Sequence, residues 1–286
     1  MAGEVGYCRG SDVGEQELFW YSGQLIQGNT LELAIDDPGL LYGAMVFTTL
    51  RVYHGSLDNP LTHWLQHGDR LKSSLQTFGW QSPDWTRLRE GAEVLCTSYP
   101  VLRIVIFPDG REWITGRFLP ADLTERQQQG VSAWLADAPE FCRALPAHKT
   151  GNYLAAWLAL QKAQQLGAKE AILVDGAGRW LETSTGNLWG WKDGGWWTPP
   201  LDVGILPGVA RSQLIAWLKE RGTTVRESPW DRQLVKEFEA IAYTNSVVEV
   251  VPIHTVITSM ERLTYASSHS SLNQLHCLFY REGTQS

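Results

Sequence analysis

The sequence lacks the patterns that mark several large classes of protein. Its four cysteines are scattered and form no Cys-x-x-Cys pair, which argues against a zinc site and a secreted disulfide framework. No stretch approaches the roughly 18 consecutive apolar residues of a membrane-spanning helix. The 24 basic residues form no run, so the sequence shows no surface for nucleic acid or an anionic membrane. A small molecule is the expected partner.

The N-terminus also lacks an export signal, because residues 1–7 contain no basic region followed by an apolar stretch. With the scattered cysteines, this predicts a soluble protein of the reducing cytoplasm. The 286 residues, 43% hydrophobic and 19% charged, are sufficient for a folded core. At roughly 150 residues per domain, the length predicts one large or two medium domains.

Residues 1–120 are expected to form an N-terminal α+β domain. Strand patterns lie at residues 17–21, 24–27, 45–53 and 102–107. Helix patterns cover about 61–78, with Leu65 and Leu71 on the apolar stripe, and about 85–98. Turn residues such as Gly and Pro separate these segments.

Residues 121–286 are expected to form a β-rich C-terminal α+β domain that carries Lys149. Strand patterns lie at residues 131–137, 170–175, 179–182, 188–191, 196–198, 240–244 and 247–253. Asp-Gly pairs at 175–176 and 193–194 are hairpin signals. Helices are expected just after Lys149, from Pro207 to Gly222 and over 272–280, and in the first of them Leu154, Trp157, Leu158 and Leu166 lie near one face.

Four segments contain residues suited to chemistry. Lys149 stands at a helix entrance, and a lysine that bonds to a carbonyl must be held in place and partly desolvated. Glu182 ends a strand, Pro207-Gly208 begins a helix whose first N–H groups suit a phosphate, and Thr244-Asn245-Ser246 ends another strand. Taken singly, they are an ordinary surface lysine, a turn glutamate, a helix start and a hydrogen-bonded turn.

In this order and at these separations, the four segments resemble the signature of the fold-type IV pyridoxal-phosphate enzymes, the class IV aminotransferase family. Segments 42–55 and 67–71 extend the resemblance over nearly the whole chain, from about Tyr21 to Pro252. The resemblance implies a two-domain α+β fold like that of D-amino-acid aminotransferases, with pyridoxal 5'-phosphate between the domains. It also implies a homodimer.

The resemblance further implies roles for individual residues. Lys149 would carry the cofactor covalently and then move protons, and Glu182 would keep the ring nitrogen protonated. A fixed cation, a hydroxyl and a helix N-terminus suit the phosphate dianion. These phosphate contacts are Arg70, Ser246 and the backbone N–H groups of Val209 and Ala210.

Within the family, Phe47-Thr48-Thr49 resembles the Phe-Thr-Thr of 4-amino-4-deoxychorismate lyases, where branched-chain aminotransferases typically show Phe-Glu-Gly. Such a lyase releases pyruvate to give 4-aminobenzoate, a folate precursor. Arg111 suits a substrate with two carboxylates, because a guanidinium binds carboxylates bidentately, although a surface arginine at a hairpin tip is an equal reading. The substrate contacts that the resemblance implies are Phe47, Thr49, Arg111 and Asn245.

Other readings stay open at this point. An aminotransferase acting on branched-chain or D-amino acids would start in the same way, and a non-catalytic protein retaining the scaffold is a third reading. His63 and His67 lie four residues apart on a predicted helix, but the Glu of the His-Glu-x-x-His pattern is missing, so no metal site is expected. Asp175-Gly-Ala-Gly178 is expected to be a hairpin turn rather than a dinucleotide-binding loop.

Overall fold

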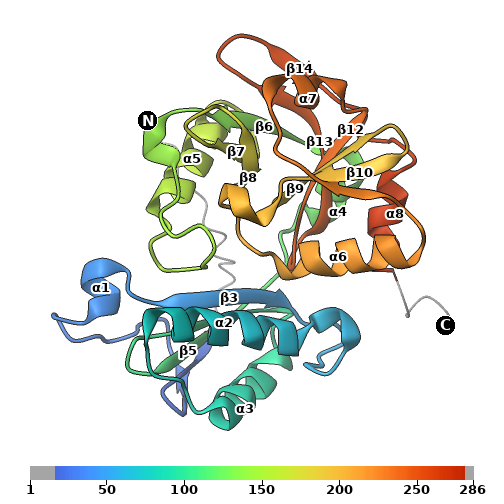
Figure 1. Ribbon diagram of the computed structural model, residues 1–286. Helices are drawn as coiled ribbons and strands as arrows, with labels where there is room; N and C mark the ends of the chain where they lie inside the picture. The colour runs from blue at the N-terminus through green and yellow to red at the C-terminus, as the bar shows by residue number, and fades with distance from the viewer. Residues whose placement is uncertain (1–16, 281–286) are drawn as a thin grey trace. The chain divides into compact units, whose positions relative to one another are not determined.

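The computed structural model describes residues 17–280 and divides the chain into two compact units (Figure 1). One unit comprises 1–120 together with Lys149–Asn152, and the other comprises the remaining residues. The lysine segment was expected in the C-terminal domain, but it groups with the first unit. The reason is main-chain pairing with β3 (Val46–Arg51): Phe47 N donates to Lys149 O and Gly151 N to Met45 O, both at 2.8 Å. The expectations for Cys8 and residues 1–7 lie outside the described residues.

The first unit is a five-stranded antiparallel sheet with two helices on one face. The strand order is β2-β1-β5-β4-β3. The remaining elements are β1 (Leu18–Tyr21), β2 (Gln24–Gln27), β4 (Val101–Ile106), β5 (Glu112–Arg117), α1 (Pro38–Tyr42), α2 (Trp64–Phe78) and α3 (Trp85–Cys96). Apolar side chains of α2 and α3, such as Leu75 and Leu88, share one core with Leu50 and Ile104 of the sheet. Because side chains alternate along a strand, Phe47 and Thr49 belong to the opposite face.

The second unit is a nine-stranded mixed sheet. Its strands are β6 (Val131–Ala136), β7 (Glu170–Val174), β8 (Trp180–Thr183), β9 (Asn187–Lys192), β10 (Gly195–Thr198), β11 (Val225–Glu227), β12 (Ala240–Asn245), β13 (Glu249–Ile257) and β14 (Arg262–Thr264). The main path runs β11-β10-β9-β12-β13-β6-β7-β8, and β14 pairs with β13. Glu182 of β8 also pairs with Asn187 of β9, so the path from β9 to β8 closes on itself.

Five helices accompany this sheet, and one of them positions the lysine segment. They are α4 (Leu123–Gln129), α5 (Leu154–Gln165), α6 (Val209–Glu220), α7 (Arg232–Glu237) and α8 (Leu272–His276). The strands β6 and β7 are parallel neighbours, and α5 is the crossover between them. Lys149 therefore lies in the connection that follows the carboxyl end of β6.

The expected strands and both hairpin turns are confirmed, including the turn at Asp175–Gly178 between antiparallel β7 and β8. Two expectations about helices were wrong. The helix pattern from residue 61 is interrupted at His63, which has φ 53°, and Leu65 is 70% exposed. Leu154 and Leu158 of α5 and Leu166 at its C-cap are exposed, because Ala156, Ala159 and Ala163 form the buried face. Within residues 17–280, no helix has the length and apolar character needed to cross a membrane.

Candidate active site

The predicted site residues fall into two sets, one on each unit. Phe47, Thr49, Arg70, Arg111 and Lys149 lie on the first unit, and Glu182, Val209, Ala210, Asn245 and Ser246 lie on the second. Each set is described within its own unit.

The Lys149 side chain lies against β3. Phe47 N donates a main-chain hydrogen bond to Lys149 O. In addition, the Lys149 Nζ atom is 4.8 Å from the centroid of the Phe47 ring. The Arg103 guanidinium of β4 is 3.7 Å from the same centroid, and Arg103 pairs with Thr49 across the strands. One ring thus contacts two cationic side chains, a setting that suits an anionic substrate beside the amine. The sequence analysis did not identify Arg103, although a charged residue within an apolar strand was a usable signal.

Arg70 is held by a short hydrogen-bond chain on the helix-covered face. Its Nη2 donates to Thr48 Oγ1 at 2.7 Å, and Thr48 Oγ1 lies 2.6 Å from His67 Nδ1. Burial lowers the pKa of Arg70 to about 10, so the guanidinium stays positive at neutral pH. Burial, together with the charges of Arg70, His63 and Lys149, lowers the pKa of His67 well below its ordinary value. Thr48 therefore joins a cation to a neutral imidazole.

Arg70 has an unused hydrogen-bond donor that could bind an anion. Within the described residues, Arg70 Nε and His67 Nε2 are shielded from solvent without a hydrogen-bond partner. A desolvated guanidinium without a carboxylate is costly unless a ligand supplies the negative charge. This observation fits the predicted phosphate contact. The same part of the chain contains no group of three His, Cys, Asp or Glu residues placed to hold a metal ion.

Arg111 is occupied by the chain's own acceptors. Its Nη2 donates to Asp37, its Nε to Asp109 and its Nη1 to the Tyr21 hydroxyl, each at 2.6 Å. Burial alone raises the pKa of Asp37, but hydrogen bonds from Arg111 and from Gly39 N outweigh it and lower the pKa below its ordinary value. These contacts give Arg111 a structural role in fixing the segment before α1.

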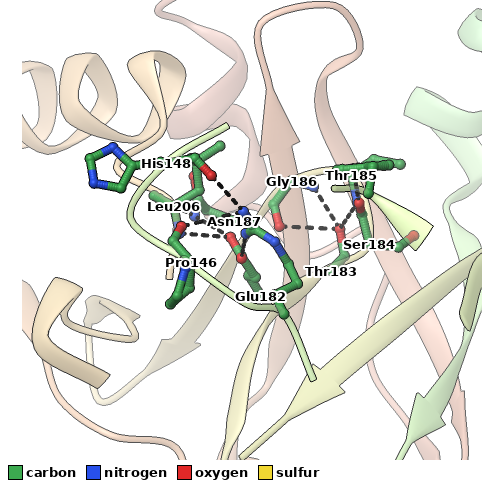
Figure 2. Close-up of polar contacts among 11 residues, drawn as sticks. Pro146, His148, Glu182, Thr183, Ser184, Thr185, Gly186, Asn187 and Leu206 are labelled. Atoms are coloured by element: carbon green, nitrogen blue, oxygen red, sulfur yellow. Dashed lines mark hydrogen bonds and ion pairs between the residues drawn. The ribbon is translucent and has the colours of Figure 1, made fainter. Parts of the chain in front are cut away.

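Glu182 is a buried carboxylate, and Figure 2 shows it beside Asn187 and Leu206. Its Oε1 forms an ion pair with Arg143 Nη1. Its Oε2 accepts hydrogen bonds from Leu206 N at 3.1 Å and Asn187 Nδ2 at 3.4 Å. Asn187 Nδ2 also donates to Leu206 O at 3.0 Å, so the carboxylate holds the loop that leads to α6. No sequence pattern had identified Arg143 or Asn187.

The first N–H groups of α6 form the second candidate phosphate contact. The helix begins at Val209, and its N-cap residue Gly208 provides no side-chain cap. A Cβ atom at Gly208 would lie 2.0 Å from Asn187 Oδ1, so the loop requires glycine there. The Val209 and Ala210 N–H groups belong to the first turn, where no intrahelical acceptor exists, and their partial positive charge suits an anion.

Asn245 and Ser246 lie in the turn between β12 and β13. Asn245 Oδ1 accepts hydrogen bonds from Val247 N and Val248 N, both at 2.9 Å, and its Nδ2 donates to Thr185 O at 3.2 Å. The Asn245 amide therefore holds this turn in place. The adjacent Ser246 side chain is half-buried.

A family model described as amino-transferase class IV matches residues 45–256. The chain belongs to the class IV aminotransferases. The branched-chain-amino-acid aminotransferase of Escherichia coli K12 is 26% identical over 267 residues, covering 84% of this chain and 85% of that protein. The aminodeoxychorismate lyase of Vibrio harveyi is 24% identical over 252 residues, covering 82% of this chain and 90% of that protein.

Solved structures of class IV aminotransferases have the same fold. The PLP-bound form of a hypothetical aminotransferase from Mycobacterium tuberculosis has a TM-score of 0.76 at 22% identity, over 90% of this chain and 96% of that one. The family resemblance and the α+β fold predicted from the sequence are thus confirmed.

Proposed function

We propose that this class IV aminotransferase is a pyridoxal-phosphate-dependent 4-amino-4-deoxychorismate lyase. The carrying observation is that Phe47, the first residue of the lyase-like Phe-Thr-Thr segment, lies against Lys149 through both its main chain and its ring. The segment that distinguishes the lyase pattern therefore adjoins the proposed catalytic amine. The similarity to the V. harveyi lyase also supports the proposal.

The residues of both units fit pyridoxal 5'-phosphate. Arg70 and the first N–H groups of α6, with the Ser246 hydroxyl, suit the phosphate. Glu182 is a buried carboxylate suited to the protonated ring nitrogen, and Lys149 supplies the amine that binds the cofactor. When bound, the cofactor would supply an electron sink for negative charge developing on the substrate.

In the proposed reaction, Lys149 removes the proton from the substrate ring carbon that bears the amine. Loss of that proton allows the ring to become aromatic as pyruvate leaves, giving 4-aminobenzoate. Arg103 is the better placed of the two candidate arginines for a substrate carboxylate, because it lies over Phe47 whereas Arg111 holds Asp37 and Asp109. Thr49, paired with Arg103, would contact the substrate on the same face, and Asn245 is the proposed contact on the second unit.

Transamination is the second candidate, and the E. coli branched-chain relative specifically favours it. An aminotransferase would use the same lysine and the same cofactor contacts, but would release a keto acid and pass the amino group to a second keto acid. The two candidates therefore differ in their products rather than in the cofactor site.

Purified wild type and Lys149→Ala provide the test. Each protein is incubated with pyridoxal 5'-phosphate and 4-amino-4-deoxychorismate, and 4-aminobenzoate and pyruvate are followed. Parallel reactions contain 2-oxoglutarate with leucine or D-alanine, and glutamate is measured. We expect 4-aminobenzoate from the wild type alone. Lys149-dependent glutamate without 4-aminobenzoate would replace the lyase with an aminotransferase, and absence of cofactor binding would overturn both.

A further inference from the structure

Arg143 contacts both the Glu182 carboxylate and main-chain carbonyls of the loop that contains Arg143. It lies in the loop between β6 and α5, and its side chain is 13% exposed. One end of the guanidinium, Nη1, pairs with Glu182 Oε1. The other end, Nη2, donates to Pro146 O at 3.3 Å and His148 O at 3.2 Å. The guanidinium thus links the carboxylate to two carbonyls of its own loop.

This arrangement uses the fork geometry that is specific to arginine. A guanidinium presents several N–H donors in a rigid plane, whereas a lysine ammonium is a single point charge. Glu182 is 5% exposed in its side chain, and its Oε2 already accepts from Leu206 N and Asn187 Nδ2. Without Arg143, Oε1 would be a buried anionic oxygen without its cation, free to rotate or to take up a proton.

The loop bound by Arg143 ends at the proposed catalytic residue. His148, whose carbonyl accepts from Arg143, immediately precedes Lys149 in the chain. Within the same loop, Leu145 has φ 52°, a left-handed conformation that is unfavourable for a non-glycine residue. The two hydrogen bonds from Arg143 to the carbonyls of Pro146 and His148 hold the loop in place just after Leu145.

We infer that Arg143 is a positioning residue, which acts on the cofactor through Glu182. Its charge and its fork hold the carboxylate ionised and oriented toward a protonated ring nitrogen. The inference rests on the proposed cofactor site, but not on whether the reaction is a lyase or an aminotransferase reaction. Removing Arg143 should therefore weaken cofactor binding when Glu182 is present, and it should have no further effect when Glu182 has already been replaced.

A double-mutant cycle in cofactor affinity tests this inference. Apo forms of the full-length wild type, Arg143→Gln, Glu182→Gln and the double variant are titrated with pyridoxal 5'-phosphate, and absorbance gives each dissociation constant. Outer partners of ligand-binding side chains contribute about 10- to 100-fold in affinity at metal sites, and we expect a similar loss for each single variant. The double variant should bind no more weakly than Glu182→Gln, because Arg143 then has no carboxylate to hold.

Arg87→Gln is the matched control. Arg87, like Arg143, pairs through its guanidinium with a buried glutamate, Glu112, and it belongs to α3, which carries none of the proposed cofactor contacts. We expect this variant to unfold at a lower temperature while keeping its cofactor affinity. Arg143→Lys should recover part of the affinity, and it takes the place of Arg143→Gln in the cycle if that variant does not fold.

Three outcomes would overturn the inference. If the fold-losses in cofactor affinity of the two single variants multiply in the double variant, Arg143 does not act through Glu182. An equal loss of affinity in Arg87→Gln would reduce the effect to general destabilisation, and unchanged affinity in Arg143→Gln would remove the role altogether. A wild type that binds no pyridoxal 5'-phosphate would instead refute the proposed function itself.

Discussion

Thr48 has a function that its place in the lyase-like segment does not suggest. Its side chain faces α2 rather than the Lys149 side of β3, and its hydroxyl orients Arg70. Hydrogen bonds to charged groups contribute about 1.5 to 3 kcal/mol, which corresponds to roughly 10- to 100-fold in binding. We therefore expect Thr48 to support the proposed phosphate contact of Arg70 rather than to bind substrate.

Arg70→Met should weaken binding of pyridoxal 5'-phosphate by about 100-fold, and Thr48→Val by about tenfold, because the first loses the cation and the second only its orientation. Absorbance titration of the apo proteins measures both. Thr62→Val is the matched control, since Thr62 is equally buried and its hydroxyl is hydrogen-bonded to Tyr53 N and Ser56 O. Cofactor affinity unchanged in Arg70→Met would remove Arg70 from the phosphate site.

The Asp37–Arg111 pair should make stability depend on pH. Because the folded-state pKa of Asp37 is below its ordinary value of 3.8, its contribution is complete well above pH 3.8 and is lost as the pH falls from there through the folded-state pKa. Asp37→Asn should therefore lower the free energy of unfolding by about 1 to 3 kcal/mol at pH 7. The difference in free energy of unfolding between Asp37→Asn and the wild type should become smaller below pH 3.8.

Urea unfolding at several pH values between about 3 and 7 measures this difference. Asp58→Asn serves as the control, because Asp58 also pairs with an arginine, Arg89, but its side chain is 78% exposed. That substitution should have little effect at any pH, as expected for exposed ion pairs. A constant gap between Asp37→Asn and the wild type across the range would contradict the assignment.

At the start of α6, one main-chain N–H donor can be removed by a substitution that leaves the helix intact. Proline is well tolerated at the first position of a helix, where its missing N–H has no intrahelical acceptor. Val209→Pro should therefore weaken cofactor binding by about tenfold with little change in thermal unfolding. Arg232→Pro, at the first position of α7, is the control and should leave cofactor affinity unchanged. Equal affinities in both variants would argue against phosphate binding at α6.

Elements whose local pattern agrees with their surroundings were predictable from the sequence. The apolar run at 102–107 became β4, and the Asp-Gly turn after Asp175 joined β7 to β8 as expected. The exposed leucines of α5 were not predictable, because the face that is buried depends on the surface opposite it. There the small side chains of Ala156 and Ala159 allow a close approach to the sheet.

The short elements α1, β5, α4, β11, α7 and β14 were missed. In α1 the helix is only five residues long and depends on a cap, in which Asp37 accepts from Gly39 N at 2.7 Å. Helical periodicity needs a longer window than that.

The candidate site also contains both residues that the sequence predicted and residues that only the structure identified. Lys149 and Glu182 lie in motifs that can be read along the chain. Arg103 and Arg143 gain their places only through tertiary structure: Arg103 by strand pairing opposite Thr49, and Arg143 by an ion pair with a residue 39 positions away. Such contacts have no fixed spacing along the chain, so the sequence can show that Arg103 is a charged residue in an apolar strand but not what either arginine contacts.

Several large apolar side chains of the first unit are exposed to solvent. Ile35, Leu41 and Tyr42, close together in the chain at α1, are 90%, 54% and 76% exposed. Soluble monomers rarely leave such apolar groups in water together, and burying them between two copies would stabilise the homodimer that the family resemblance implies.

Sedimentation velocity provides the measurement. The wild type should sediment as a dimer, and the double substitution Ile35→Asp with Tyr42→Asp should shift it toward the monomer, because an interface would then have to desolvate two carboxylates. Met260→Asp is the control, since Met260 is 71% exposed on the second unit, next to β14, and this variant should remain dimeric. A monomeric wild type would refute the dimer, whereas a dimer that persists in the double variant would place the interface on a different surface.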